Sequence, residues 1–243
     1  MPTLPLYKEI RDQLVESLVR QQWRPGEVLP SEKDLAKQFS VAVSTIRSAI
    51  AELVDANILV RKQGKGTYVT HHGVRGGRYR FFNVVNASGV KEPFYRTLIS
   101  IKVEKAGVDA LRVFEFPKST RQPEVYRIRF KLSGEGPPFS MAEVILPCHF
   151  FRDLEREAIV DGDESLYALY QQRFGVNIVQ VVEHLFAVKA PALVARALSL
   201  PADEPVLEIR RTGYTYNNVA VEQRTTWIHT SDFHYFVTQG AQS

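Results

Sequence analysis

The sequence predicts an α+β fold in which a small helical unit is joined to a larger unit built on an antiparallel sheet. Three observations carry this prediction. Apolar residues recur at helical spacing through residues 5–56, and after residue 80 the pattern changes to alternating strands with a few helices. The composition, with 44% apolar and 24% charged residues among 243, is typical of folded globular domains and excludes collagen and low-complexity fibres.

Positive charge is concentrated in the first third of the chain. Residues 1–80 hold 13 Lys and Arg against 8 Asp and Glu, whereas residues 81–243 hold 18 against 19. A basic unit joined to a nearly neutral one is typical of a chain that binds an anionic polymer through one end. The 6 histidines are scattered without metal-ligand spacing, so we expect neither a metal site nor a cofactor.

The cysteine content and the N-terminus bear on the compartment. Cys148 is the single cysteine, so no disulfide can form within one chain. The first residues contain no cationic start followed by an apolar core, and no apolar stretch has the length of a membrane span. We therefore expect a protein of the reducing cytoplasm.

Three helices are predicted in the first 56 residues. The first covers about residues 5–22 and ends at Trp23-Arg24-Pro25-Gly26, because proline and glycine interrupt helical structure. The second begins after Ser31, a favourable N-cap that is followed by acidic residues. The third runs from about Val43 to Ala56. Two short helices joined by a tight turn are typical of a helix-turn-helix.

A short hairpin is predicted directly after the third helix. Ile58–Arg61 and Thr67–Val69 are β-like runs that flank Gln63-Gly64-Lys65-Gly66. A Gly-Lys-Gly tip lets the backbone and a cation approach a phosphate or a groove closely. Helices and hairpin together predict a winged helix-turn-helix over residues 1–70.

Several segments of this unit match, in order, the pattern of one bacterial family: Pro5-Leu6-Tyr7, Pro25-Gly26, Leu29-Pro30-Ser31-Glu32, Leu35-Ala36, Thr45-Ile46-Arg47 and Gln63-Gly64-Lys65-Gly66-Thr67-Tyr68-Val69. By these segments the unit resembles the GntR family of transcription regulators. The resemblance implies binding of double-stranded operator DNA through Ser31, Ser44, Thr45, Arg47, Arg61, Lys62, Lys65 and Gly66. Ser31 can serve equally as a helix cap or as a phosphate contact.

The turn between the second and third helices departs from the family pattern. The family usually has Gly-Val-Ser-Arg there, and this chain has Ser40-Val41-Ala42-Val43. Ala42 offers no capping side chain, a loss that typically costs about 1 kcal/mol. Val43 replaces an arginine that reaches a base edge in relatives, where a contact with guanine discriminates by about 1–3 kcal/mol. We therefore do not expect the family's operator consensus to apply unchanged.

The remaining chain is predicted to form a linker and a sheet-containing unit. Residues 71–80 are glycine-rich and basic without periodicity, which is typical of a linker. Within residues 81–243, Leu98–Val103 and Tyr126–Leu132 are predicted strands, the second with strict alternation. Helices are predicted at Glu164–Phe174 and Pro191–Leu200.

A weak internal repeat suggests two similar hairpins in this second unit. Val125–Arg129, followed by Glu143, is echoed by Val206–Arg210, followed by Glu222. Each half of the repeat has the pattern of strand, turn and strand. Two such halves on one antiparallel sheet, with helices beside it, predict the α+β architecture stated above.

Looser motifs give this unit a resemblance of its own: Glu164-Ser165-Leu166-Tyr167, Leu198-Ser199-Leu200-Pro201, Glu204-Pro205-Val206-Leu207, Arg210-Arg211-Thr212 and Val221-Glu222. By these motifs it resembles the UTRA effector-binding domain of the HutC subfamily, whose fold is related to chorismate lyase. The resemblance implies a small-molecule site on the sheet, formed by Asn83, Arg129, Lys131, Glu143, Ser165, Tyr167, Glu222 and Arg224. Guanidinium and ammonium groups bind carboxylates and phosphates, so we expect an anionic metabolite.

Six of these eight residues also have a purely structural alternative. The alternative for Arg129 and Lys131 is a solvated strand face, and the alternative for Ser165 is an N-cap that binds no ligand. Tyr167 can be a core aromatic residue, and Glu222 and Arg224 can simply pair with each other. The register of Glu143 differs by one position from an acidic residue found in relatives.

The two resemblances together imply a homodimeric transcription regulator, with repression that a small metabolite relieves. One alternative is a lyase-like enzyme fused to a DNA-binding unit. No nucleophile–base pair, metal-ligand spacing or phosphate-binding loop favours it, so we expect no enzyme activity. Another is an architectural DNA-binding protein, which predicts a second unit without a polar-lined pocket.

Overall fold

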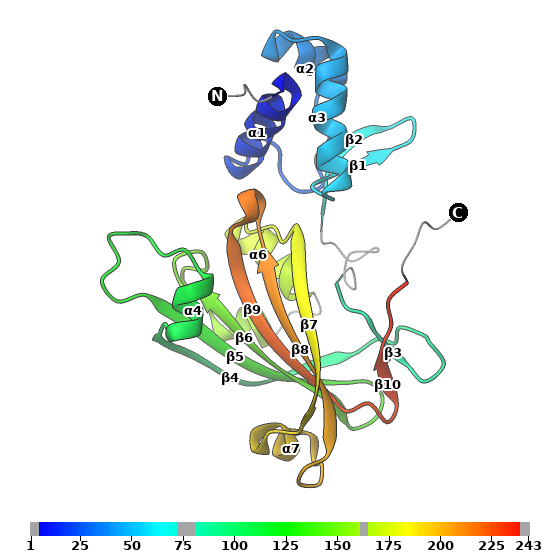
Figure 1. The fold of residues 1–243 in the computed structure, drawn as a ribbon, viewed down its shortest axis with the longest axis vertical. Helices are drawn as coiled ribbons and strands as arrows, with labels where there is room; N and C mark the ends of the chain where they lie inside the picture. Colours follow the sequence, from blue (N-terminus) through cyan, green and yellow to red (C-terminus); the bar gives the residue numbers. More distant parts are fainter. Residues whose placement is uncertain (1–4, 72–80, 161–164, 239–243) are drawn as a thin grey trace.

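The computed structural model describes residues 5–71, 81–160 and 165–238. Two units follow one another along the long axis of the molecule (Figure 1): the head, residues 5–71, and the body, residues 81–238. Of the predicted linker, 72–80 lies outside the described residues. Within the described ranges, no helix is long and apolar enough to cross a membrane.

The head is the predicted winged helix-turn-helix. Three helices pack around one apolar core, and an antiparallel hairpin follows them. Its elements are α1 (Leu6–Val19), α2 (Glu32–Phe39), α3 (Val43–Asp55), β1 (Leu59–Lys62) and β2 (Gly66–Val69). The first helix ends three residues earlier than predicted, because Gln21 adopts a positive φ of 56° that no α-helix accommodates.

The turn between α2 and α3 has the geometry that the family's glycine would suit. Ser40 lies in the left-handed region with φ 54° at the end of α2. Ala42 precedes α3 and makes no capping hydrogen bond, as its side chain predicts. Ser31 does cap α2, since its hydroxyl accepts a hydrogen bond from the backbone amide of Asp34.

The body is built on an antiparallel sheet that has six strands in the described ranges, in the order β4-β5-β6-β9-β8-β7. These strands are β4 (Tyr95–Lys105), β5 (Glu124–Ser133), β6 (Pro138–Pro147), β7 (Gln180–Lys189), β8 (Pro205–Tyr214) and β9 (Ala220–Ile228). Hairpin β5–β6 is joined to hairpin β8–β9 through the pairing of β6 with β9, which confirms the two halves of the internal repeat.

Shorter elements lie around this sheet. They are β3 (Val84–Asn86), α4 (Val108–Val113), α5 (Arg156–Val160), α6 (Leu166–Phe174), α7 (Ala192–Leu198), the 3-10 turn η1 (Tyr216–Asn218) and β10 (Phe233–Tyr235). The predicted helices at 164–174 and 191–200 are thus confirmed as α6 and α7, with Glu164 outside the described residues. Strands β3 and β10 pair with each other.

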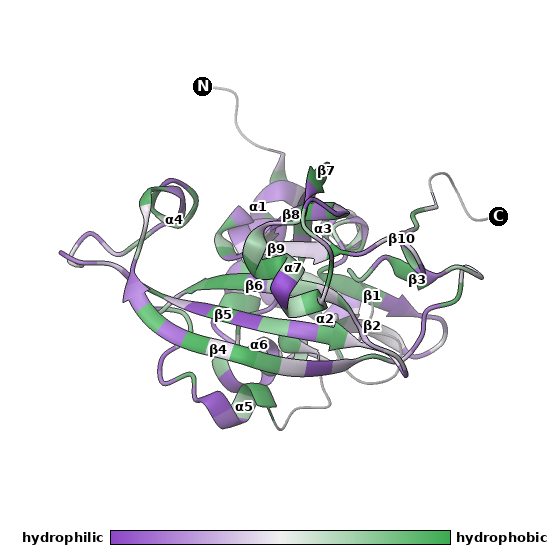
Figure 2. Cartoon of the chain, turned by 90° about the horizontal axis from the view of Figure 1, so that it is seen from below, coloured by the Kyte–Doolittle hydropathy of each residue, from purple (hydrophilic) through white to green (hydrophobic). Residues whose placement is uncertain are grey.

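The two faces of the sheet have different surroundings, as Figure 2 shows. The inner face, defined by Ile128, Phe130 and Leu132 of β5, packs against α5 and α6 in the main core of the body. The outer face carries α7, which packs on Met141 of β6. Hydrophobic and hydrophilic residues alternate along β5 in Figure 2. Because successive side chains of a strand point to opposite faces, even- and odd-numbered residues of β5 lie on different faces of the sheet.

Candidate functional site

The predicted DNA-contacting arginines of the head share one carboxylate. Glu32 of α2 accepts a hydrogen bond from Arg47 of α3 at 2.9 Å and from Arg61 of β1 at 3.3 Å. Both arginine side chains remain exposed. The carboxylate therefore holds two guanidinium groups from different elements on one surface, where they can face a phosphate backbone or a base edge.

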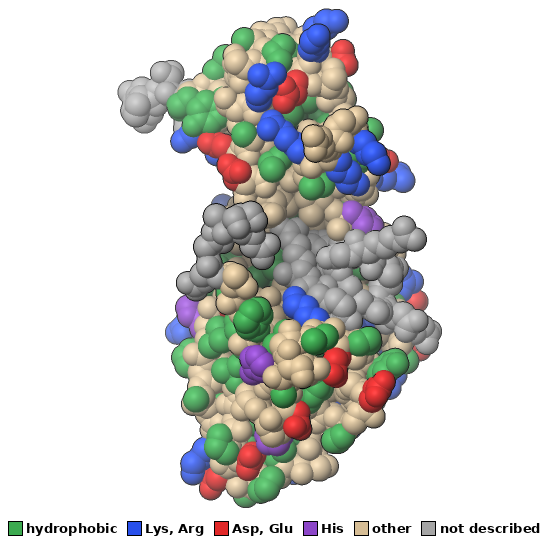
Figure 3. Space-filling model, turned by 90° about the vertical axis from the view of Figure 1, so that its right-hand side faces the viewer, with side chains coloured by type: hydrophobic (Ala, Val, Ile, Leu, Met, Phe, Trp, Pro, Cys, Tyr) green, Lys and Arg blue, Asp and Glu red, His purple; other side chains and the backbone are tan. Residues whose placement is uncertain are grey.

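The other predicted contacts considered next lie on α3 and on the hairpin. Ser44 is exposed in the first turn of α3, and Thr45 beside it is half-buried. Lys62 lies over the Tyr68 ring at 4.2 Å, and Lys65 is exposed at the hairpin tip. Basic side chains gather on the head in the view of Figure 3.

Gly66 is required by geometry as well as by access. Its φ is +112°, and a Cβ there would lie 3.3 Å from Val28 Cγ2. Ser31 is engaged as the α2 cap and also donates to the Asp34 carboxylate at 2.6 Å. The Ser31 hydroxyl is therefore already hydrogen-bonded within α2, and a phosphate contact would have to share it.

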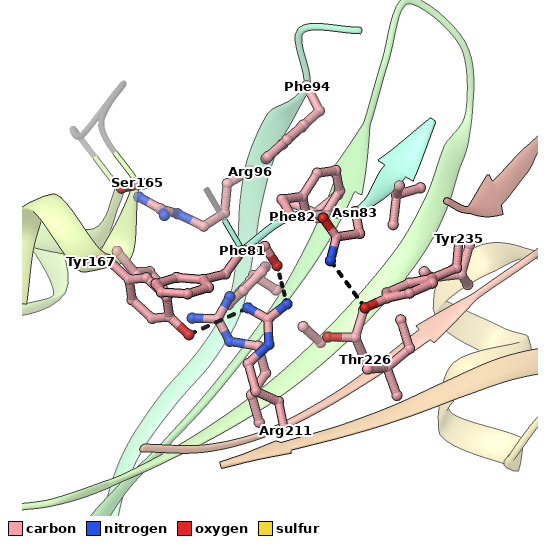
Figure 4. A pocket seen from close by; sticks show the side chains of 18 residues that line it. Phe81, Phe82, Asn83, Phe94, Arg96, Ser165, Tyr167, Arg211, Thr226 and Tyr235 are labelled. Atoms are coloured by element: carbon pink, nitrogen blue, oxygen red, sulfur yellow. Dashed lines mark hydrogen bonds between the residues drawn. The ribbon is translucent and has the colours of Figure 1, made fainter. Parts of the chain in front are cut away.

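The body contains a pocket on the inner face of the sheet (Figure 4). It lies between the start of α6, the segment before β3, and strands β4, β5, β8 and β9. Its volume is about 80 Å³. Aromatic and aliphatic side chains form most of its wall, and three arginines, Arg96, Arg211 and Arg224, provide positive charge.

Five of the eight residues predicted for an effector site lie at this pocket. Asn83, Ser165, Tyr167 and Arg224 line it. Glu222 lies directly behind it, fully buried, and accepts hydrogen bonds from three groups. The donors are the hydroxyl groups of Tyr167 and Tyr170, each at 2.9 Å, and the guanidinium of Arg224 at 2.7 Å.

Burial sets the protonation of this cluster. It raises the pKa of Tyr167 to about 12, with a further contribution from the negative charge of Glu222. Burial alone would lower the pKa of Arg224, but the Glu222 carboxylate together with Tyr167 and Tyr170 outweighs it and raises that pKa. The tyrosine is therefore neutral and the arginine charged throughout the physiological range.

The other three predicted residues do not reach the pocket. Arg129, Lys131 and Glu143 lie on the outer face, because their parity along β5 and β6 is opposite to that of Phe130 and Ala142, which line it. Glu143 binds Arg129 at 2.6 Å and also Arg127, so these charges are paired with each other. These three residues therefore cannot contact a ligand in this pocket. The expectation that all eight residues surround one ligand is wrong for them.

The internal repeat predicted equivalent positions in the sheet for Glu143 and Glu222. The pairing of the strands shows that the two positions are not equivalent. Arg129 is opposite Glu143, whereas Arg210 is opposite Thr225 and not Glu222. The second acid is thus offset by three residues from the equivalent position. An odd offset places it on the other face of the sheet.

Sequence reasoning missed two arginines of the pocket, Arg96 and Arg211. Arg211 is almost fully buried and binds Glu183 at 2.6 Å, the Tyr167 hydroxyl at 3.3 Å and the Phe81 carbonyl. Arg96 donates to the carbonyl of Ile159 at 2.9 Å. Each shares strand parity with an inner-face apolar residue, Leu98 or Ile209, and a cation at such a position is a signal that the sequence did contain.

The pocket and the head are connected through α6. This helix carries Ser165 and Tyr167 at its pocket end, and one turn further on Gln171 donates to the carbonyl of Thr70, the residue after β2, at 3.3 Å. The same amide nitrogen also binds Asn177 Oδ1 at 2.9 Å, and Asn177 donates to the hydroxyl of Tyr216 at 2.9 Å. All three side chains are buried.

Tyr216 extends this connection into the head. It belongs to the turn between β8 and β9, yet only 8% of its surface is exposed because its ring packs into the apolar core of the head. Figure 1 shows this turn directed at α1. Gln21, just after α1, also lies close to Gly175 at the end of α6.

A winged helix-turn-helix joined to a sheet domain whose pocket holds three arginines indicates a DNA-binding protein with a small-molecule site. Comparison with known families identifies it further. Residues 6–69 match the family described as bacterial regulatory proteins, gntR family, and residues 96–234 match the UTRA domain. The chain therefore belongs to the GntR family of bacterial regulators, with the architecture of the HutC subfamily. Operator DNA and a small-molecule effector are the partners that these two domains imply.

Curated relatives agree with this assignment. The chain is 24% identical to the mannosyl-D-glycerate transport/metabolism system repressor MngR of Escherichia coli K12, over 95% of this chain and 94% of that protein. It is 25% identical to the transcriptional repressor NagR of Bacillus subtilis, over 94% and 96% of the two chains. Family and relatives are transcriptional regulators and not enzymes, so the protein is a DNA-binding transcriptional regulator, and the lyase-like alternative is set aside.

Solved structures share the fold. The ligand-binding domain of a GntR-family regulator from Bordetella bronchiseptica is 27% identical with a TM-score of 0.63, covering 67% of this chain and 99% of that domain. PhnF from Mycobacterium smegmatis, at 20% identity and a TM-score of 0.53, covers 98% of this chain and 100% of its own.

Proposed function

We propose that this regulator is a homodimeric repressor whose operator affinity falls when a small anionic metabolite enters the body pocket. Two heads would occupy successive major grooves of a near-palindromic operator, about one helical turn apart. Division into residues 1–70, 71–80 and 81–243, and action in the cytoplasm, belong to the same proposal.

The observation that carries the proposal is that one helix serves both the pocket and the head. Ser165 and Tyr167 of the α6 region line the pocket, while Gln171 binds the backbone of Thr70. A ligand that shifts the start of α6 therefore acts on a contact of the head. Coupling between effector and DNA sites is typically worth 1–3 kcal/mol, which corresponds to about 5–150-fold in operator affinity.

The DNA-contacting residues proposed are those of the shared-carboxylate surface and its surroundings. Arg47 and Arg61, oriented by Glu32, support contacts from α3 and the hairpin. Further contacts are proposed for Ser31, Ser44, Thr45, Lys62, Lys65 and Gly66. The modest net charge of the head supports dimeric binding, because few phosphates can be neutralised by one copy.

Selection of bound duplexes from a random pool, followed by fluorescence anisotropy, tests the DNA part. We expect a near-palindromic duplex and about a tenfold or larger loss of affinity for Arg47→Ala. Arg20→Ala is the matched control, since that arginine is exposed directly after α1 and pairs only with Glu16 among the described residues. Absence of any sequence-selective complex would reject the proposal.

The assembly and the effector are tested on the same purified protein. Light scattering should give the mass of two chains. Native mass spectrometry of that species should detect a co-purified small molecule or its exchange, and addition of the molecule should lower the anisotropy of the operator complex. A ligand that binds in the pocket without changing operator affinity would contradict the proposed coupling.

A further inference from the structure

The buried cations that border the pocket on β8 and β9 are already matched in charge. Arg211 is paired with Glu183 at 2.6 Å, and Arg224 is paired with Glu222 at 2.7 Å. Both carboxylates are buried, at 10% and 0% side-chain exposure. A ligand with two negative charges would therefore enter beside two buried carboxylates, whereas a single negative charge meets far less repulsion.

Arg224 is the cation of this pair that has donors left for a ligand. Arg211 uses Nε, Nη1 and Nη2 in hydrogen bonds to Glu183, Tyr167 and Phe81. Arg224 uses Nη2 for Glu222, and its buried Nε has no hydrogen-bond partner among the described residues. A buried N–H without a partner is unusual in a native fold and indicates a place where a ligand acceptor completes the site.

A hydroxyl lies on the same strand face as this guanidinium. Thr226 is two residues after Arg224 on β9, and both line the pocket. A planar carboxylate accepts two hydrogen bonds from a guanidinium and a further one from a hydroxyl. Arg96, at the Ser165 end, is bound to the carbonyl of Ile159 and stands over the Phe130 ring.

The rest of the wall suits an apolar body. Phe82 and Phe94 face each other with ring centroids 4.6 Å apart, and Leu132 and Ile228 continue the surface. Two of the polar groups opposite are engaged with each other: Asn83 binds the Tyr235 hydroxyl at 3.0 Å. Sugar hydroxyls placed against this wall would lose hydrogen bonds to water without replacement.

We infer that the effector is a small monocarboxylate with an aromatic or aliphatic body, a conclusion that rests on the effector function proposed above. Arg224 and Thr226 bind the carboxylate, and Phe82 and Phe94 contact the body. The pocket volume of about 80 Å³ is below the roughly 300–1,000 Å³ of pockets that hold drug-sized ligands, so the ligand is expected to be small. This class differs from the polyhydroxy compounds in the names of two Escherichia coli relatives, mannosyl-D-glycerate and fructoselysine.

Titration calorimetry on the full chain with matched probes tests the inference. The probes are benzoate, 3-phenylpropionate and hexanoate, the amide of each, and glucose 6-phosphate. We expect at least one carboxylate to bind about tenfold or more tightly than both its amide and glucose 6-phosphate. Equal binding of acid and amide, tighter binding of glucose 6-phosphate, or no binding of any carboxylate would overturn it.

Two variants locate the site. Arg224→Lys keeps a positive charge beside Glu222 but removes the planar donor set, so we expect carboxylate affinity to fall about tenfold. Arg129→Lys, on the outer face, makes the same chemical change outside the pocket and should leave affinity unchanged. Operator binding by each ligand-free variant shows that it is folded. Equal affinity of Arg224→Lys and the unmodified protein would reject the assigned carboxylate position.

The operator complex separates this inference from the proposed function. If glucose 6-phosphate binds the pocket and releases the operator, the effector mechanism stands and the ligand class is wrong. If a carboxylate binds through Arg224 and the operator complex persists, the ligand class stands and the effector mechanism is wrong.

Discussion

The substitution Glu222→Gln tests the buried cluster behind the pocket. Glutamine keeps the shape of the side chain and one acceptor oxygen, but it leaves the mostly buried Arg224 guanidinium without its fully buried carboxylate partner. Removing one partner of a buried ion pair costs about 3–5 kcal/mol. Because the remaining oxygen can still accept a tyrosine hydroxyl, we expect the lower end, about 3 kcal/mol of unfolding free energy.

Urea unfolding followed by tryptophan fluorescence measures this loss. The chain has 2 tryptophans, so a Trp23→Phe background leaves Trp227, on β9 of the body, as the single reporter. Glu16→Gln is the control, because Glu16 forms an exposed pair with Arg20 and should cost no more than about 0.5 kcal/mol. A loss for Glu222→Gln that equals the control would refute a stabilising contact between Glu222 and Arg224.

Three further predictions follow from the same geometry. The pKa of Tyr167 is raised from 10.0 to about 12, so its contribution to stability is complete below pH 10 and is lost as the pH rises from 10 to about 12. Across that window the unfolding free energy of the unmodified protein should therefore fall by roughly 3 kcal/mol more than that of Tyr167→Phe, and parallel curves would contradict the shift. Gln171→Ala should leave effector affinity unchanged, but the factor by which the effector lowers operator affinity should be about fivefold smaller. Anisotropy of the operator complex with and without the effector measures this factor, and an unchanged factor would show that the coupling does not pass through this side chain. Gly175→Ala should lower the unfolding free energy by about 1–2 kcal/mol, because Gly175 has a φ of +67°. The new Cβ would also meet the side-chain amide of Gln21, so full recovery in a double variant with Gln21→Ala would assign the loss to that clash and not to the backbone.

The head was predictable from sequence because its signals are local. Helical periodicity, the Ser31 cap and the Gly-Lys-Gly tip each act within a few residues, and the structure contains all of them. The early end of α1 was not predictable in the same way. It depends on the backbone of Gln21, and glutamine carries no intrinsic preference for a positive φ.

The pocket was predictable only in part because it depends on sheet register. Strict alternation along β5 correctly separated Phe130 from Arg129, but the sequence did not show which face would hold the ligand. Residues on α6 and β9, such as Tyr167 and Arg224, were found through family motifs. Arg211 required knowing that the inner face is the buried one, since only there does a cation need a partner such as Glu183.

The position of Tyr216 bears on whether the head can be treated as an interchangeable part. A ring supplied by the body packs on the core of the head, so a head grafted onto a foreign effector domain would expose the apolar surface that Tyr216 covers. Exposing buried apolar surface to water costs roughly 25 cal/mol per Å². Chimeric regulators made from this chain should therefore transfer the β8–β9 turn together with the head, and sensor design should treat that turn as belonging to both halves.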